Sequence, residues 1–336
     1  MQIKDRKIRI ALPSKGLLAE GSRQLLIDVG FPIYSPNPRQ YIAGIPLLPG
    51  IEVIFQRPGD IVTSVRDGSV DFGITGRDIY LEKKDSSSKI LELHHQLDFG
   101  KCTLNVIIPD DWTEIKTLQD LEAYQKTILR PLKVATKFPS LASSYFQDKT
   151  EIPIEIIQAE GALEIAPTVG YADLIVDLVS TGTTLRDNRL KRLPGGKILD
   201  SEACLIANYK QLKNNPETLK MAIQLLEMIG AHLRGRKNLA VFANIRASSE
   251  QEISEKIFNK DVIGGLQGPT ISRILAPEAN NFFAIHIVVK KEQLHNAIGE
   301  LREIGGSGVV VSPVNYIFEE EPQELTAMMA ALGEEI

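Results

Sequence analysis

Ala172-Asp-Leu-Ile-Val-Asp-Leu-Val-Ser-Thr-Gly-Thr-Thr-Leu185 is an apolar run that carries two aspartates and ends in a hydroxyl-rich turn around one glycine. Its leucine and β-branched residues predict a strand that is buried on both faces, as in a parallel sheet. Because side chains alternate along a strand, Asp173 and Asp177, four residues apart, are expected on one face. Two carboxylates in such a strand are anomalous, which makes both aspartates candidate site residues.

The turn after this strand is Ser180-Thr181-Gly182-Thr183-Thr184, and the residues that follow it have helical character. Backbone N–H groups at the start of a helix bind phosphate, and the hydroxyls add further donors. The plainer interpretation is a Ser/Thr-rich turn with a helix cap. Five small or hydroxyl residues directly after a strand with paired acids favour the phosphate site.

Composition excludes several classes of protein. The 336 residues are 43% hydrophobic and 24% charged, with a formal net charge of −5. A global basic field for nucleic acid is therefore absent, and no apolar run reaches the length of a membrane span. The charged N-terminus lacks the apolar core of an export signal. We expect a cytoplasmic protein with neither nucleic acid nor membrane as a partner.

Cations and glycines follow the first strands of the chain. Lys15 and Gly16 come after the predicted strand 7–12, Arg57 after the strand 51–55, and Gly76 at the end of the strand 70–76. Open α/β sheets bind ligands at the carboxyl ends of their strands, so these residues are expected at a binding edge. A surface lysine in a turn is the alternative for Lys15.

Strands and helices alternate through two lobes, and the order then changes to βαββαβ. We predict an α/β protein with a bilobal, periplasmic-binding-protein-like core and a C-terminal ferredoxin-like domain. Lobe I is expected at 1–98, completed by about 195–233, and lobe II, with the phosphate loop, at 99–194. The ferredoxin-like domain is expected at 238–336, after a linker at 234–237. Small-ligand sensing or subunit contact suits it better than catalysis.

Several ordered blocks resemble the long form of the ATP phosphoribosyltransferase family. The family's signature is met by Glu164, Gly170, Ala172, Ile175, Asp177, Leu178, Thr181, Gly182, Thr184 and Leu185. Further blocks match in order at residues 9–16, 55–58, 71–76, 99–102 and 135–137, and the βαββαβ tail resembles the family's regulatory domain. One departure is Phe138-Pro139-Ser140, where the family has a Tyr-Pro-Asn type of turn.

The resemblance implies the first step of histidine biosynthesis. N1 of ATP would displace pyrophosphate from 5-phosphoribosyl 1-pyrophosphate, with Mg²⁺ on the pyrophosphate. The loop 180–184 would hold the 5-phosphate and Asp177 the ribose hydroxyls, with Asp173 a weaker candidate. Lys15 and Arg57 would neutralise the phosphates of pyrophosphate or ATP, beside the backbone at Gly16 and Gly76.

The resemblance also implies regulation. Histidine and AMP would inhibit the enzyme, which would assemble as a homo-oligomer, from a dimer to a hexamer. The stretch containing Gly268, Thr270 and Ser272 is our candidate for effector contact.

Two alternatives stay open at this level. One is a non-catalytic bilobal small-ligand binding protein or sensor, because solute receptors share the bilobal fold. The other is a phosphoribosyltransferase that uses a different base.

Overall fold

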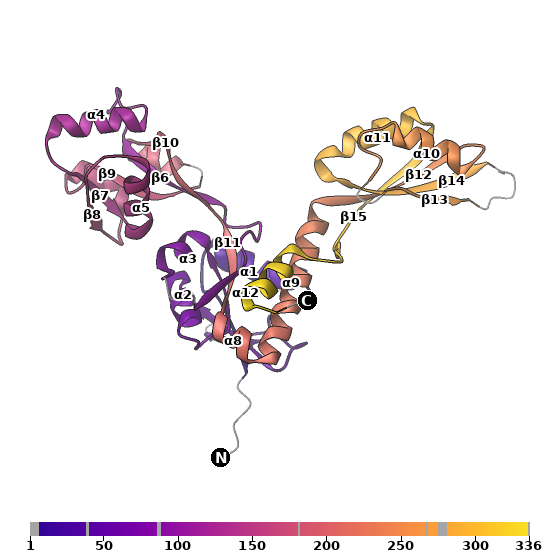
Figure 1. Cartoon of the computed structure of the whole chain (residues 1–336), viewed down its shortest axis with the longest axis horizontal. Coiled ribbons are helices and arrows are strands. Elements are labelled where there is room, and N and C mark those ends of the chain that lie inside the picture. The colour runs from indigo at the N-terminus through magenta and orange to yellow at the C-terminus, as the bar shows by residue number, and fades with distance from the viewer. Residues whose placement is uncertain are drawn as a thin grey trace, which may run out of the picture. The chain divides into compact units, whose positions relative to one another are not determined.

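A computed structural model describes residues 7–37, 40–85, 89–180, 182–265, 268–274 and 281–334. The chain forms two units: one contains residues up to Ile223 together with those from Ala327 onward, and the other runs from Gln224 to Thr326. Figure 1 shows the chain and the labels of its elements. Among the described residues, no helix is long and apolar enough to cross a membrane.

The first lobe is built on a six-stranded mixed sheet in the order β2-β3-β1-β4-β11-β5. Its strands are β1 (Ile8–Pro13), β2 (Ile42–Gly44), β3 (Ile51–Gln56), β4 (Phe72–Gly76), β5 (Ile90–His94) and β11 (Ala203–Asn208). β1, β3 and β4 are parallel neighbours, so their carboxyl ends lie at one edge. The Pro-rich segment 32–50, expected as a loop or excursion, contains the short strand β2, which pairs antiparallel with β3.

Helices α1 (Leu17–Asp28), α2 (Pro58–Arg66) and α3 (Arg77–Lys83) directly follow β1, β3 and β4, and α8 (Tyr209–Asn214) and α9 (Pro216–Arg236) follow β11. The α2 helix lies against β4, where Gly73 leaves room for it. A Cβ at Gly73 would overlap the side chain of Ile61. Ile61, Val62 and Val65 of α2 are fully buried, so this close approach forms part of the lobe's core.

The second lobe contains a five-stranded mixed sheet in the order β10-β6-β9-β7-β8. Its elements are β6 (Cys102–Pro109), α4 (Leu118–Ile128), β7 (Leu132–Thr136), α5 (Pro139–Lys149), β8 (Ile154–Gln158), η1 (Leu163–Ile165), α6 (Ala166–Val169), β9 (Leu174–Val179), α7 (Thr183–Asp187) and β10 (Leu190–Ser201). β9 is the central strand, parallel to β7 and antiparallel to β6. The residues Leu174, Ile175 and Val176 are fully buried, which confirms the expected doubly covered strand.

The length of β10 differs from the sequence-based prediction, which placed a strand only at 197–199. β10 is an edge strand paired with β6, and its register shifts between Arg192 and Lys197. Pro194, Gly195 and Gly196 occupy this irregularity. An edge strand tolerates a bulge and a proline because its outer side has no partner whose bonds are lost.

The C-terminal unit contains a four-stranded antiparallel sheet in the order β13-β14-β12-β15. Its elements are β12 (Asn238–Arg246), α10 (Glu250–Phe258), β13 (Thr270–Arg273), β14 (Phe282–Lys290), η2 (Lys291–Gln293), α11 (Leu294–Glu303) and β15 (Gly306–Pro313), and α12 (Gln323–Leu332) follows them. Figure 1 shows α10 and α11 on one face of this sheet. The predicted ferredoxin-like order is confirmed.

The predicted linker at 234–237 is wrong, because α9 continues to Arg236 and β12 begins at Asn238. The helix end is held by the returning chain. The Nε of Arg234 donates to the carbonyl of Ile317 at 3.0 Å, and the N–H of Ile317 donates to the carbonyl of Ala231. These partners lie about eighty residues away in the sequence, so local sequence patterns do not predict the contact.

Candidate active site

The hydroxyl-rich loop lies at the carboxyl end of β9, as the sequence predicted. Gly182 has a φ of 78° and is the N-cap of α7, a left-handed conformation that glycine adopts without strain. Ser180, Thr183 and Thr184 are exposed, so their hydroxyls are accessible to a ligand. Thr181, which belongs to the predicted loop, lies outside the described residues. A turn of this kind at a helix start offers backbone N–H groups to an anion.

Asp177 lies on β9 just before this loop, opposite Asn105 of β6. Its Oδ1 accepts a hydrogen bond from the backbone N–H of Leu178 at 2.8 Å. Burial raises the pKa of the Asp177 carboxyl, and the negative charge of Glu164 raises it further, whereas the Leu178 N–H and the positive charge of Lys137 oppose this. The group is therefore a half-buried carboxylate poised beside a cation.

Lys137 was not predicted as a site residue, although its block entered the resemblance. It follows β7, which is the parallel neighbour of β9, so it reaches the same edge of the sheet as Asp177. Its positive charge lowers the pKa of Asp177, as expected for two side chains at one edge of the sheet. The sequence feature that could have identified Lys137 is its position directly after a buried strand.

Asp173 is not brought together with the loop. It precedes β9, so it lies at the amino end of the strand, about 13 Å along the chain from Asp177 at about 3.3 Å per residue. Its carboxylate accepts two hydrogen bonds from Arg130, both 2.7 Å, and one from the Lys133 N–H at 2.8 Å. Burial alone would raise the pKa of Asp173, but these bonds and charges hold it below its usual range. The geometry corrects the expected pairing of the two aspartates.

The cations predicted for the first lobe lie at the carboxyl ends of adjacent strands. Lys15 and Gly16 follow β1, and Arg57 follows β3, with which β1 pairs in parallel. All three residues are exposed. Gly76 ends β4 on the other side of β1, but it is buried, and a Cβ there would lie 2.6 Å from Oδ1 of Asp78. Gly76 therefore offers only backbone groups.

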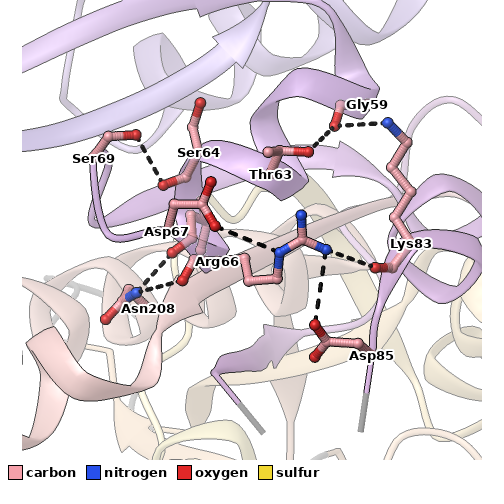
Figure 2. Close-up of polar contacts among 10 residues, drawn as sticks. Gly59, Thr63, Ser64, Arg66, Asp67, Ser69, Lys83, Asp85 and Asn208 are labelled. Carbon is pink, nitrogen blue, oxygen red and sulfur yellow. Dashed lines mark hydrogen bonds and ion pairs between the residues drawn. The ribbon is translucent and has the colours of Figure 1, made fainter. Parts of the chain in front are cut away.

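The α2 helix, which begins directly after Arg57, is fixed at both ends (Figure 2). Near its start, the carbonyl of Gly59 accepts hydrogen bonds from Thr63 Oγ1 and Lys83 Nζ, each 3.3 Å. At its end, Asn208 Nδ2 donates to the carbonyl of Val65 at 2.7 Å. These bonds hold the helix, and with it the backbone of Arg57, at the edge of the sheet.

Arg66 makes polar contacts at the far end of α2 and does not extend to the Arg57 end. Its guanidinium lies 3.6 Å from Asp67 and 3.9 Å from Asp85, and it donates to the carbonyl of Lys83 at 3.5 Å (Figure 2). The long distances and exposure make each contact weak. Arg66 therefore has a structural role, because it connects the end of α2 to the end of α3.

The predicted effector residues lie on and just before an edge strand. Thr270 and Ser272 belong to β13, opposite His286 and Ala284 of β14, and Gly268 precedes the strand with a φ of 93°. All three are exposed. They are accessible to a ligand or to another chain.

Comparisons with known proteins decide the family. A sequence profile described as ATP phosphoribosyltransferase matches residues 57–229, and one described as HisG, C-terminal domain matches residues 236–316. ATP phosphoribosyltransferase 2, chloroplastic, of Arabidopsis thaliana is 41% identical over 97% of this chain and 81% of its own length. The chain belongs to the ATP phosphoribosyltransferase family.

Two further similarities agree with this family. ATP phosphoribosyltransferase of Methanosarcina acetivorans is 32% identical over 92% of this chain and 99% of its own length. A solved structure, the ATP phosphoribosyl transferase (HisG:HisZ) complex from Thermotoga maritima, covers 66% of this chain and 98% of its own, at 24% identity and a TM-score of 0.52, and supports the fold. The chain is thus an ATP phosphoribosyltransferase of the long form, acting at the first step of histidine biosynthesis, with a C-terminal regulatory domain.

Proposed function

We propose that the enzyme transfers the phosphoribosyl group from 5-phosphoribosyl 1-pyrophosphate to N1 of ATP, with release of pyrophosphate and inversion at the anomeric carbon. The observation that carries this proposal is Asp177 on β9, which lies three residues before a loop where the side chains of Ser180, Thr183 and Thr184 are exposed. A phosphate and a ribose require this combination of backbone donors and a carboxylate acceptor.

The loop 180–184 would bind the 5-phosphate through backbone N–H groups and hydroxyls, and Asp177 would accept hydrogen bonds from the ribose hydroxyls. The carboxylate must be ionised to accept both, and Lys137 favours the ionised form. No protein nucleophile is needed, because catalysis rests on holding two anionic substrates in line and stabilising the departing oxygen. Asp173 has a structural role in this proposal.

Lys15 and Arg57 would neutralise the pyrophosphate or the ATP phosphates at the edge of the first sheet. Among the residues described by the structure, no group of three or more His, Cys, Asp or Glu side chains could hold a metal ion. In this proposal Mg²⁺ is held mainly by the phosphate oxygens of the substrates, as Mg²⁺ commonly is. Bound there, Mg²⁺ would add positive charge to the leaving pyrophosphate.

We further propose that histidine inhibits the enzyme through the C-terminal domain, with Gly268, Thr270 and Ser272 near the effector, and that AMP inhibits as well. The exposed edge strand β13 is compatible with effector binding or with contact to another copy in a dimer or hexamer. A cytoplasmic location stays a prediction, and the Arabidopsis relative carries "chloroplastic" in its name.

An absorbance assay tests the reaction. Protein, Mg²⁺, ATP and 5-phosphoribosyl 1-pyrophosphate are mixed, and the ultraviolet absorbance of the N1-substituted adenine nucleotide is followed. A rise that requires both substrates is expected. A folded protein that binds both substrates without a rise would support the binding-protein alternative, and a rise only with another base would support the second enzyme alternative.

Deletion of residues from Asn238 onward tests the regulatory assignment. Because α9 ends at Arg236, the cut leaves this helix complete. Inhibition by histidine should disappear. A chain that ends at Glu321, and so lacks only Pro322, α12 and the residues after it, is the control and should stay inhibited. Inhibition of the longer deletion would place the effector site outside the C-terminal domain.

A further inference from the structure

The short helix α3 makes contacts with both lobes of the catalytic unit. It begins directly after Gly76, at the carboxyl end of β4 in the first lobe. The side chain of Ile79 packs against the apolar core of the first lobe and also against the core of the second. None of the residues that we expect to contact substrate lies in α3, so its contacts with both lobes point to a role in holding the lobes together.

A buried pair fixes the start of α3 to the strand that leaves the second lobe. The hydroxyl of Ser201, the last residue of β10, donates to Oδ1 of Asp78 at 2.6 Å and accepts from the Asp78 backbone N–H at 2.9 Å. Both residues are 4% exposed. The backbone carbonyl of the next residue, Glu202, accepts from the Arg77 N–H at 2.9 Å. The amino end of α3 is therefore held at the crossing between the lobes.

A second contact fixes the carboxyl half of α3 to the second lobe. The two carboxylate oxygens of Glu82 accept from the backbone N–H groups of Ser140, at 2.9 Å, and Leu141, at 3.0 Å. These N–H groups belong to the first turn of α5, whose N-cap, Phe138, makes no side-chain cap bond. A carboxylate suits this position because helix N-termini carry unpaired donors and partial positive charge.

The same helix also reaches the element that carries Arg57. Lys83 at the end of α3 donates to the carbonyl of Gly59 in α2, which begins directly after Arg57 (Figure 2). On the other side, α5 follows β7, the parallel neighbour of the strand that delivers Asp177. One seven-residue helix thus connects the two sheet edges at which the substrates are expected to bind.

We propose that Glu82 is a positioning residue whose bond to the start of α5 sets the spacing between Arg57 in the first lobe and Asp177 with the loop 180–184 in the second. The proposal rests on the proposed function, in which one phosphoribosyl donor contacts both edges. The Asp78 and Ser201 pair fixes the crossing, and Glu82 fixes the angle between the lobes about that crossing. Without Glu82, the lobes sample a wider range of separations, and fewer molecules are competent to bind.

Spin labels measure this spacing directly in the full chain. Lys126 in α4 and Lys210 in α8 are exposed residues of the second and first lobes, so cysteines there report the separation of the lobes. Burial raises the pKa of the Cys102 thiol to about 11 and that of Cys204 well above its usual value, so both native thiols react slowly. A parent chain without the added cysteines gives the labelling background.

In this doubly labelled chain, the Glu82→Ala substitution should broaden the distance distribution measured by double electron–electron resonance roughly twofold. Glu82→Gln keeps one acceptor oxygen and should give an intermediate width. The matched control is Glu300→Ala, because Glu300 also accepts from two backbone N–H groups, of Val262 and Ile263 at 3.0 Å each, but within the C-terminal domain. The control should leave the distribution unchanged.

In the unlabelled enzyme, Glu82→Ala should raise KM for the phosphoribosyl donor about tenfold and change kcat much less, because it lowers the fraction of binding-competent molecules. A wild-type distance distribution in Glu82→Ala overturns the proposal, whatever the kinetics. A broadened distribution with unchanged KM overturns the positioning role. Inactive wild-type enzyme would contradict the proposed function instead, and the spin-label result would still test the contact.

Discussion

Replacing Asp177 with Asn removes one charge and keeps the size of the side chain. The Asn oxygen can still accept from the Leu178 N–H, which bonds Asp177 at 2.8 Å, so β9 and the loop after it keep their conformation. The lost property is the ability to accept two strong hydrogen bonds from the ribose hydroxyls. The substitution therefore separates the chemistry of the site from its fold.

The magnitude follows from the strength of hydrogen bonds to charged and neutral acceptors. A bond to a charged group contributes about 1.5–3 kcal/mol and a neutral bond about 0.5–1.5 kcal/mol. For two ribose hydroxyls, Asp177→Asn should cost about 2–3 kcal/mol, which is a roughly 30- to 150-fold fall in kcat/KM for the phosphoribosyl donor. The absorbance assay for N1-substituted nucleotide measures this ratio.

The same substitution should stabilise the folded protein at neutral pH. Burial raises the pKa of Asp177, so the folded state favours the protonated carboxyl, and the stability of that form is lost as the pH rises through the folded pKa. Asn has no such loss, so Asp177→Asn should raise Tm near pH 7 and should leave Tm unchanged below the unfolded carboxyl pKa.

The kinetic result decides the role of Asp177 in the site. A kcat/KM of Asp177→Asn within about threefold of wild type would refute its assigned role as acceptor for the ribose hydroxyls.

Three further predictions concern residues around the site and in the C-terminal domain. Asp173→Asn, a matched change just before β9, should keep kcat/KM, and a large fall in kcat/KM would contradict the structural role of Asp173. Because the pKa of Asp173 is lowered, the substitution should reduce Tm at neutral pH, and this deficit should disappear as the pH falls through the lowered folded pKa. Lys137→Ala should shift the acid limb of the pH profile of kcat/KM to higher pH, since a cation that lowers the pKa of Asp177 is removed; an unmoved limb would argue against their coupling. Gly235→Ala should destabilise the protein by about 2 kcal/mol in denaturant unfolding, because the added Cβ would lie 2.6 Å from the Asn315 carbonyl. The control is Gly299→Ala in α11, where the added Cβ would have nothing within 4 Å and should stabilise the protein by about 0.5–1 kcal/mol. Equal effects of the two substitutions on the free energy of unfolding would contradict this packing.

Much of the fold could be predicted because its signals are local. Alternating buried strands and amphipathic helices fixed the two lobes, and the order βαββαβ fixed the third domain. The strand β10 was largely missed because Pro194, Gly195 and Gly196 have the composition of a loop. Only the pairing with β6 shows that an edge strand continues through them.

The site was predictable in its parts and less so in its geometry. Spacing placed Asp173 and Asp177 on one face but did not show that β9 begins at Leu174, which leaves Asp173 at the far end beside Arg130. That ion pair joins residues 43 positions apart, and the contact of Glu82 with Ser140 spans 58. Such contacts depend on how elements pack, which local composition does not encode.

A structure of the enzyme with 5-phosphoribosyl 1-pyrophosphate and Mg²⁺ tests the central claim most directly. The 5-phosphate should lie on the backbone N–H groups and hydroxyls of the loop 180–184, with the ribose hydroxyls within hydrogen-bonding distance of Asp177. A 5-phosphate bound elsewhere, with Asp177 away from the ribose, would contradict the account.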